Sequence, residues 1–429
     1  MRPATLVITL RQRSRGHALD CKTLRRANGQ EAACRPTVLV RALLVDFALD
    51  AFQRSLRDES LTLAQSFSMD YWRARDTDSQ YPWEFVRAFA DRGWLGLTIP
   101  EKYGGAGLGI VESSIMLHSI CLSGAGTSGA SPIHFYSFPP APIVKYGSED
   151  MKRQMLPRIA SGELMIAFGV TEPSAGSDTS RIETTAVRSN GSWVINGQKI
   201  WTTNAQNAQK ILLLVRTASR DPSRPFSGMT LFFTDLDREA CSVRKIDKLG
   251  RAAIDSNEVF ITNLKATDEE IVGEIGQGFY HLISALNPER IVIAMEAAGI
   301  GRAALAIASE YARNRIVFDE PIGRYQAVSH PLAQCWAELE AAELLALKAA
   351  WLFDRGEPCG NEANAAKLLA AEAGFKACDA AVQTLGGFGY AKEYHVERLW
   401  REVRLYKIAP LSQQLVLNHI ARHALDLPK

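Results

Sequence analysis

The sequence has few cysteines, no large charge imbalance and no long apolar run. Its seven cysteines are scattered and include no Cys-x-x-Cys pair, so we expect no disulfide framework, no metal site and a reducing compartment. Lys and Arg number 49 against 47 Asp and Glu, so no bulk charge favours nucleic acid or an acidic membrane surface. The most apolar stretch, 291–308, contains Glu296 and Arg302, which predicts no membrane span.

The first 45 residues differ from the rest because they are strongly basic, with nine Lys and Arg against two acidic residues. One interpretation is an Arg-rich transit peptide, which would place the protein in the mitochondrial matrix. The other is a disordered or non-native leader ahead of a domain that starts near Asp46, in a cytoplasmic protein. We favour the second interpretation, because the segment has no sustained apolar face and no clear processing signal.

The remaining chain divides by its texture into three regions: 46–162, 163–275 and 276–429. The first is amphipathic and loop-rich, which predicts an all-α domain with the glycine-rich run 103–109 as a turn between helices. The second contains short runs rich in Val, Ile, Thr and Phe, which predict a small antiparallel sheet. In the third, apolar residues recur at alternating spacings of four and three, as in the seam of a helical bundle: Ile293, Ala297, Ile300, Ala304 and Ile307.

A hairpin turn is predicted inside the second region at Asn196-Gly197. The dipeptide stands between two strand-like runs, and both of its residues tolerate the positive φ of a type I′ turn. We therefore expect the two runs to be neighbouring antiparallel strands.

The run LNPERIV, 286–292, allows two interpretations of Glu289. In the structural one, Asn287 is the N-cap of a helix, Pro288 is its first residue, and Glu289 is an acid favoured by the helix dipole. In the functional one, Glu289 is a catalytic carboxylate. The local pattern alone favours the structural interpretation.

Four further runs place small, polar or aromatic residues at the ends of elements: FGVTEPSAGSD (168–178), WTTN (201–204), YARNRIVFDEPIGRYQ (311–326) and QTLGGFGY (383–390). The second offers an indole and two hydroxyls, which suit stacking on a planar heterocycle and hydrogen bonding to its edge. Glycines between long helices, as in the last two, usually mean turns or close approach to a ligand. Each run taken alone is equally consistent with an ordinary loop or core residue.

In their order and spacing, the four runs resemble the acyl-CoA dehydrogenase family of flavoproteins over residues 46–425. The resemblance implies an α+β multidomain fold with an N-terminal all-α domain, a central antiparallel β-barrel-like domain and a C-terminal four-helix bundle. It implies FAD as the cofactor and an acyl-CoA from fatty acid or branched-chain metabolism as the substrate. It also implies a homo-oligomer, tetramer or dimer, and an electron-transfer flavoprotein or similar acceptor.

The resemblance also implies roles for individual residues. The strand ends that contact the flavin are Phe168, Val170, Thr171, Gly176, Trp201, Thr202 and Thr203. The groups that hold FAD largely for a neighbouring subunit are Arg315, Phe318, Gln326, Gln383, Gly386 and Gly387, with Ser412 and Gln414 as further FAD contacts. The substrate contacts are Ser177, Asn287 and Arg290. Asp319 is a departure, because the family usually has glycine at this turn.

The catalytic glutamate that many members carry is missing from its usual place. It stands 27 residues after the glutamine of QTLGG, and that position is Pro410 here. A minority, of the isovaleryl- and long-chain kind, carry the base on a helix that begins with an E-R pair, and that position is Glu289. We therefore predict Glu289 as the base. Pro410 also lacks the N–H that would face the thioester oxygen, so Leu411 or a flavin hydroxyl must supply this donor.

The resemblance therefore predicts FAD-dependent α,β-dehydrogenation of an acyl-CoA to the 2-enoyl-CoA. The alternatives are a flavin oxidase or monooxygenase of the same fold acting on a non-thioester substrate, and a flavin-bearing regulatory protein that has lost its base. Glu289 and Ser177 favour the dehydrogenase. Acyl chain length and branching stay open, because one sequence does not fix the floor of the pocket.

Overall fold

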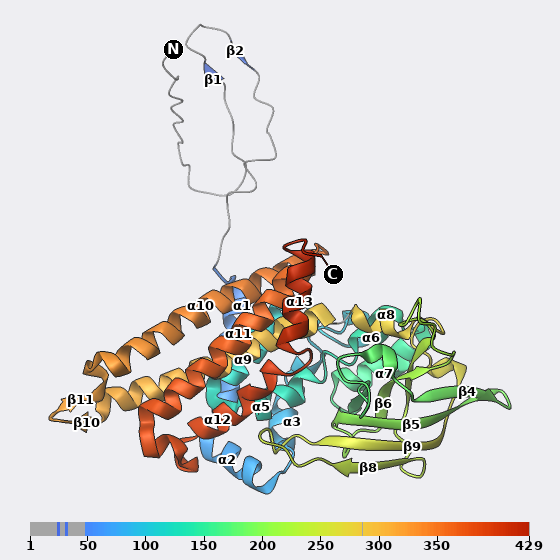
Figure 1. The fold of residues 1–429 in the computed structure, drawn as a ribbon, viewed down its shortest axis with the longest axis horizontal. Helices are drawn as coiled ribbons and strands as arrows, with labels where there is room; N and C mark the ends of the chain where they lie inside the picture. Colours follow the sequence, from blue (N-terminus) through green and yellow to red (C-terminus); the bar gives the residue numbers. More distant parts are fainter. Residues whose placement is uncertain (1–23, 26–30, 33–47, 285, 429) are drawn as a thin grey trace. The chain divides into compact units, whose positions relative to one another are not determined.

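The computed structural model describes residues 24–25, 31–32, 48–284 and 286–428, and it divides the chain into two units, Met1–Asp50 and Ala51–Lys429 (Figure 1). In the first unit, β1 (Leu24–Arg25) pairs with the antiparallel β2 (Glu31–Ala32). The rest of the predicted basic leader lies outside the described residues.

The second unit begins with a helical domain that is built around large aromatic side chains. Trp72, Phe85 and Phe89 are fully buried in it. Ser68 and Ser148 cap two of its helices, because each hydroxyl accepts the N–H of the third residue on. The helices are α1 (Ala51–Gln65), α2 (Met69–Asp78), α3 (Trp83–Ala90), α4 (Ile110–Ile120), α5 (Gly126–His134), α6 (Ala141–Tyr146) and α7 (Glu149–Ala160).

The glycine-rich run 103–109 is a turn, as predicted. It follows the short helix η3 (Glu101–Tyr103) and ends where α4 begins at Ile110. A Cβ atom on Gly105 would lie 2.0 Å from the carbonyl oxygen of Ile99, so no larger residue fits this close approach of two backbone segments.

The central domain is one seven-stranded sheet, with the order β3-β6-β4-β5-β9-β8 and β7 beside β6. It is mostly antiparallel, but β6 runs parallel to β3 and, at one residue pair, to β4; the β4–β5 hairpin lies between β3 and β6 in the chain. A parallel pair needs such a long crossover connection. The strands are β3 (Ile166–Gly169), β4 (Thr185–Ser189), β5 (Ser192–Thr203), β6 (Lys210–Arg216), β7 (Met229–Asp235), β8 (Cys241–Lys245) and β9 (Ser256–Ala266).

The predicted hairpin turn at Asn196–Gly197 is wrong, because β5 runs straight through both residues. The hairpin is formed six residues earlier, at Asn190–Gly191, where both residues have positive φ, 51° and 81°. Gly197 instead marks a register shift of β5 against β9, and a Cβ atom there would lie 2.4 Å from the Thr184 hydroxyl oxygen. A glycine inside a strand often marks such a bulge.

The last part of the chain is helical again, and α9 runs through its middle against α4, α10 and α11 (Figure 1). The predicted apolar seam of α9 is confirmed, since four of its five residues are buried and Ile307 is partly buried. The elements are α8 (Gly278–Ile283), α9 (Leu286–Asn314), β10 (Ile316–Val317), β11 (Glu320–Pro321), α10 (Gln326–Asp354), α11 (Gly360–Leu385), α12 (Val396–Val403) and α13 (Gln413–His423).

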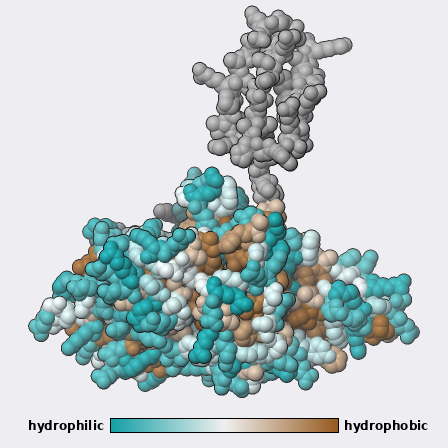
Figure 2. Space-filling view, turned by 180° about the vertical axis from the view of Figure 1, so that it is seen from behind, coloured by the Kyte–Doolittle hydropathy of each residue, from teal (hydrophilic) through white to brown (hydrophobic). Residues whose placement is uncertain are grey.

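The helical segment Gly278–Asn314 is long and apolar enough to cross a membrane by composition, yet 83% of its most apolar window is buried inside the fold. A core helix meets the same criteria, so composition is weak evidence for a span. The face opposite to the one seen in Figure 1 is mostly hydrophilic, with hydrophobic residues in separate patches (Figure 2).

Candidate active site

The ends of β3 and β5 lie side by side and carry predicted flavin contacts. Thr171 follows β3, and its carbonyl accepts a hydrogen bond of 2.9 Å from the Ile200 N–H. Just beyond this bond Trp201 takes a left-handed φ of 60°, and its side chain is 54% exposed. Thr202 and Thr203 are buried. The strand ends therefore present an accessible indole beside two buried hydroxyls.

The other predicted residues of this group lie in the same place. The Phe168 ring lies 4.9 Å from the ring of Phe138, which belongs to the helical domain. Val170 follows β3 directly, and Gly176 and Ser177 lie exposed in the loop that continues from it. The predicted strand-end group is thus brought together at the border between the sheet and the first helices.

A buried ion pair stabilises the loop that continues from β3 through Val170 and Gly176. Lys199 Nζ lies 2.7 Å from a carboxylate oxygen of Glu172 and donates to the Val170 carbonyl at 3.1 Å. The same carboxylate accepts the N–H groups of Glu183 and Thr184. Burial lowers the pKa of Lys199 to about 8. Burial alone would raise the pKa of Glu172, but the Lys199 charge and these donors keep it below its ordinary value.

Glu289 lies in the first turn of α9, and its side chain is 9% exposed. Its Oε2 atom lies 2.7 Å from Nε2 of His134, the last residue of α5. On the other side of the ring, Nδ1 lies 2.9 Å from Oε1 of Glu296. Burial alone would lower the pKa of His134, but the two carboxylates raise it to about 10. The carboxylate of Glu289 is thus paired with a cation rather than left as a simple helix-start acid.

The predicted N-cap at Asn287 is wrong, because α9 already begins at Leu286. The Asn287 side chain accepts a hydrogen bond of 2.8 Å from Arg290 rather than from the helix backbone. Within residues 48–284 and 286–428, Arg290 Nε is buried and has no hydrogen-bond partner. Two of the three predicted substrate contacts, Asn287 and Arg290, therefore lie at the start of the helix that carries Glu289.

A buried arginine connects Glu289's surroundings to the strand ends. Arg251, in the loop before β9, places its guanidinium 3.3 Å from the hydroxyl of Ser131 and 3.4 Å from that of Thr203. Ser131 and His134 lie three residues apart on α5, and such residues share one face of a helix. Glu289 is therefore linked through α5 to the predicted flavin contacts: His134 contacts Glu289, and Ser131 contacts Arg251, which reaches Thr203.

The second predicted FAD group lies at the other end of the molecule, around the β10–β11 hairpin (Figure 1). The group has two parts, residues 315–326 and 383–387. Tyr311, near the end of α9, links them, because its ring lies 6.3 Å from the ring of Phe388. The start and end of α9 are about 42 Å apart at the usual rise per residue, since the helix has 29 residues. This group does not meet the strand ends within one chain, and its members are exposed: Arg315, Phe318, Gln326, Gln383, Gly386 and Gly387.

Asp319 makes the hairpin turn where the family usually has glycine. Its φ is 65°, after 54° at Phe318, so both central residues are left-handed. Aspartate tolerates this conformation better than most residues. Asp319 can therefore adopt the left-handed conformation that this turn requires.

The segment around Pro410 carries no carboxylate and is held by α11. Lys367 Nζ, buried in α11, donates to the Leu411 carbonyl at 2.7 Å. Ser412 caps α13 by accepting the Leu415 N–H, and Gln414 is exposed in the first turn of that helix. The Ser412 hydroxyl therefore has a structural partner, the Leu415 N–H, in addition to its predicted contact with FAD.

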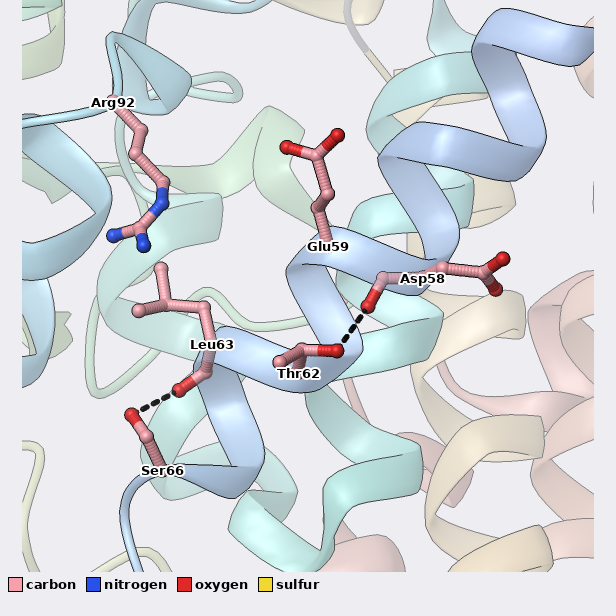
Figure 3. A pocket seen from close by; sticks show the side chains of 6 residues that line it. All are labelled: Asp58, Glu59, Thr62, Leu63, Ser66 and Arg92. Atoms are coloured by element: carbon pink, nitrogen blue, oxygen red, sulfur yellow. Dashed lines mark hydrogen bonds between the residues drawn. The ribbon is translucent and has the colours of Figure 1, made fainter.

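A surface pocket on the N-terminal domain lies outside this site (Figure 3). Hydrogen bonds from Thr62 to the Asp58 carbonyl and from Ser66 to the Leu63 carbonyl occur along its wall. Its lining contains none of the predicted site residues: Asp58, Glu59, Thr62, Leu63, Ser66 and Arg92.

Several residues of the site were not predicted from the sequence. Glu172 stands inside the run 168–178 and Lys199 lies two residues before the run 201–204, so their positions carried a signal even though their pairing did not. His134 and Arg251 lie outside every run, and Glu296 was noted only as a charge that interrupts an apolar stretch. Single buried charges of this kind have no local signature.

The fold and the site together define a flavoprotein oxidoreductase with a sheet domain between two helical domains. Family models of the acyl-CoA dehydrogenases match all three parts: the N-terminal domain at 50–163, the middle domain at 167–264 and the C-terminal domain at 276–425. The chain belongs to the acyl-CoA dehydrogenase family.

Known relatives match along nearly the whole chain. An acyl-CoA dehydrogenase of Mycobacterium bovis is 36% identical over 381 residues, 88% of this chain and 97% of the relative. An acyl-CoA dehydrogenase of Bacillus subtilis is 36% identical over 347 residues, 81% of this chain and 90% of its own. The structure of a glutaryl-coenzyme A dehydrogenase in complex with glutaryl-CoA superposes with a TM-score of 0.85, at 30% identity, covering 90% of this chain and 98% of that one.

The family's enzymes use FAD, and the residues at the strand ends fit this cofactor. The Trp201 indole is accessible and directly follows Ile200, whose N–H donates to the Thr171 carbonyl. An exposed indole at this position suits contact with a planar ring. The Thr203 hydroxyl accepts from Arg251, so its own O–H remains available as a donor. Thr202 Oγ1 is buried without a hydrogen-bond partner in the described part of the chain. The chain is therefore an FAD-dependent dehydrogenase.

Proposed function

We propose that this dehydrogenase converts an acyl-CoA thioester to the 2-enoyl-CoA, with Glu289 as the base and an electron-transfer flavoprotein as the electron acceptor. One observation carries the proposal. A buried carboxylate at the start of α9 adjoins, through α5, the strand ends that suit a flavin. No carboxylate occupies the family's commoner position, which is Pro410.

The chemistry requires a carboxylate in such a place. The α-hydrogen of a thioester is only weakly acidic, so a positioned base must remove it as the C–C bond is oxidised. When bound, FAD accepts the β-hydrogen as hydride. Glu289 is nearly excluded from water, and His134 holds one of its two carboxylate oxygens in place.

Negative charge that develops on the thioester oxygen needs a hydrogen-bond donor. Pro410 has no N–H, but the next residue, Leu411, is fixed by Lys367 through its carbonyl. Across residues 48–284 and 286–428, the Leu411 N–H has no hydrogen-bond acceptor in the protein. We assign Leu411 as the protein donor, acting beside a hydroxyl of the flavin.

Anaerobic mixing with a panel of acyl-CoAs tests the reaction. We expect thioesters to bleach the flavin absorbance, and branched or medium-to-long acyl chains to do so faster than butyryl-CoA. Addition of an electron-transfer flavoprotein should then restore the absorbance. A flavin that no thioester bleaches, but that turns over a non-thioester substrate with oxygen, would assign the oxidase or monooxygenase instead.

We further propose that a second copy of the chain completes each FAD site, in a dimer or tetramer. Arg315→Ala should then weaken FAD binding about tenfold or more, because the diphosphate loses a charge-assisted hydrogen bond worth about 1.5–3 kcal/mol. The measurement is the flavin-to-protein ratio after gel filtration, with the FAD dissociation constant. Arg313→Ala is the matched control. Arg313 lies two residues before Arg315 in the chain, and its side chain pairs on the surface with Glu310. Equal FAD affinity in both variants would contradict the assignment.

A further inference from the structure

His134 is held between two carboxylates of one helix. Glu289 and Glu296 are seven residues apart on α9, almost two turns, so they lie on the same face. The imidazole at the end of α5 occupies the space between them. All three side chains are at most 9% exposed, which is unusual for two acids within 3 Å of one ring.

The two contacts of the ring differ in kind. The pair Nε2 and Glu289 Oε2 forms a hydrogen bond of 2.7 Å. The pair Nδ1 and Glu296 Oε1 is an ion pair at 2.9 Å without hydrogen-bond alignment, since Glu296 Oε1 has no aligned partner among the described residues. Two carboxylates on opposite sides favour the ring in its charged form, in which both nitrogens carry a proton.

A lone imidazolium beside Glu289 would make that carboxylate a weaker base. Glu296 counteracts this effect, because its charge lies on the far side of the same ring. Tyr406 in turn donates its hydroxyl to Glu296 Oε2. One cation between two carboxylates leaves a net charge of minus one for the three groups, so a proton can still be taken up.

The remaining oxygen of Glu289 is left for another partner. Oε2 is committed to His134, whereas Oε1 has no hydrogen bond within residues 48–284 and 286–428. Because the ring fixes one oxygen, the rotamer of the carboxylate is fixed as well. This is how a second group orients a catalytic base.

We propose that His134 and Glu296 are positioning residues of the base: His134 holds Oε2 of Glu289 and leaves Oε1 for the substrate, and Glu296 offsets the charge of His134. This inference rests on the proposed dehydrogenation. In that reaction the α C–H bond breaks and an O–H bond forms on Glu289. The electron pair enters the new C=C bond as the β-hydrogen leaves as hydride to FAD. The net charge of the three groups rises from minus one to zero.

Other titratable groups face this trio from the elements packed around it. All of them are unchanged in Glu296→Gln and His134→Gln, so they do not affect the comparison of these two variants with the wild type. They are Cys121 of η4 (Cys121–Ala125), Arg251 of the loop before β9, Arg290 of α9, Glu402 of α12 and Tyr406 of η10 (Arg404–Lys407).

Two variants of the trio should shift the pH profile in opposite directions. In the wild type, the rate of flavin reduction rises with pH as the trio loses a proton. Glu296→Gln leaves the imidazolium uncompensated, so this rise should move to lower pH and the plateau rate should fall. His134→Gln removes the cation beside Glu289, so the rise should move to higher pH. A neighbouring charge at this distance shifts a titration by about one to three pH units.

His118→Gln is the matched control. His118 on α4 lies 3.1 Å from Glu343, a similar His–Glu pair outside the site, so its loss should leave the profile in place. Tyr406→Phe gives a further measurement if His134→Gln does not retain FAD. It removes the hydroxyl that donates to Glu296 Oε2, so the rise should move to higher pH by a smaller amount than in His134→Gln.

A second readout isolates the proton transfer from the flavin's reduction. An acyl-CoA with sulfur in place of the β-carbon has no β-hydrogen to lose, so in D₂O the enzyme can only exchange its α-hydrogen. The pH dependence of this exchange, followed by mass spectrometry, should shift in the same opposite directions.

The outcomes separate this inference from the proposed function. If the wild type neither bleaches with thioesters nor exchanges the α-hydrogen, the proposed function fails. If the wild type does both, but the two variants leave the profiles unmoved or shift them in the same direction, only this inference fails. A loss of thermal stability alone would then make the trio a structural clamp between α5 and α9.

Discussion

Glu289→Gln is expected to slow the reduction of the flavin by acyl-CoA by about 10² to 10⁴, the usual contribution of a positioned general base. The amide keeps the shape of the side chain and can still contact His134, but it cannot take up the α-proton. FAD content and acyl-CoA binding should be unchanged. Anaerobic stopped-flow spectroscopy at saturating substrate measures the effect.

Glu362→Gln is a matched control for this variant. Glu362 is also the acid in the first turn of its helix, α11, and it pairs on the surface with Lys348. Its loss should cost at most about 1 kcal/mol of stability and leave flavin reduction intact. If Glu289→Gln behaves in the same way, Glu289 is only a helix-start acid and the proposed base is wrong.

A carboxylate placed at the family's commoner position gives an additional test. Pro410→Glu in the Glu289→Gln background would approach the substrate from the side of α11 and α13. Recovery of part of the rate would show that the loss in Glu289→Gln is the loss of a base.

Lys199→Met is expected to lower the free energy of unfolding by about 3–5 kcal/mol, because it leaves the buried carboxylate of Glu172 without its cation. Lys199 is fully buried and Glu172 is 4% exposed, so water cannot replace the lost partner. Lys199 also donates to the carbonyl of Val170, at the start of the loop that carries the predicted flavin contacts, so FAD affinity should fall as well. Urea denaturation of the holoenzyme and of the FAD-stripped protein separates the two effects.

Two comparisons test the cause of this loss. Lys199→Met with Glu172→Gln should recover part of the stability, because no uncompensated charge remains and the amide oxygen can still accept from Glu183 or Thr184. Lys210→Met removes a lysine on β6 that pairs with the exposed Asp235 and, at 3.8 Å, with Glu270, and should cost about 0–1 kcal/mol. Equal losses in Lys199→Met and Lys210→Met would show that burial of the pair is not the cause.

The domain pattern of this fold could be predicted from the sequence, because hydrophobic period and turn chemistry are local. The seam of α9 follows from its spacing alone. The hairpin turn shows the limit of this approach, since the sequence contains Asn-Gly at both 190–191 and 196–197. The two dipeptides have equal local preferences, and only the contact of Gly197 with Thr184 and the register of the sheet distinguish them.

The candidate site could be predicted only where it consists of runs of adjacent residues. The strand ends and the position of Glu289 follow from such runs. The partner of Glu289 does not, because His134 lies 155 residues away in the sequence and is brought to it by the packing of α5 on α9. Asn287 was misassigned for a related reason, since the helix start is set by tertiary contacts as well as by capping preference.

The length of α9 has a consequence for how this protein can diverge. The helix carries Glu289 in its first turn and leads directly into Arg315 at its far end. Inserting or deleting one residue between them would translate the far end by about 1.5 Å and rotate it by roughly 100°. Substitutions along the helix can be accommodated one at a time, whereas a change of length would misplace both ends at once. Insertions and deletions should therefore collect in the loops of homologous chains and be absent from α9.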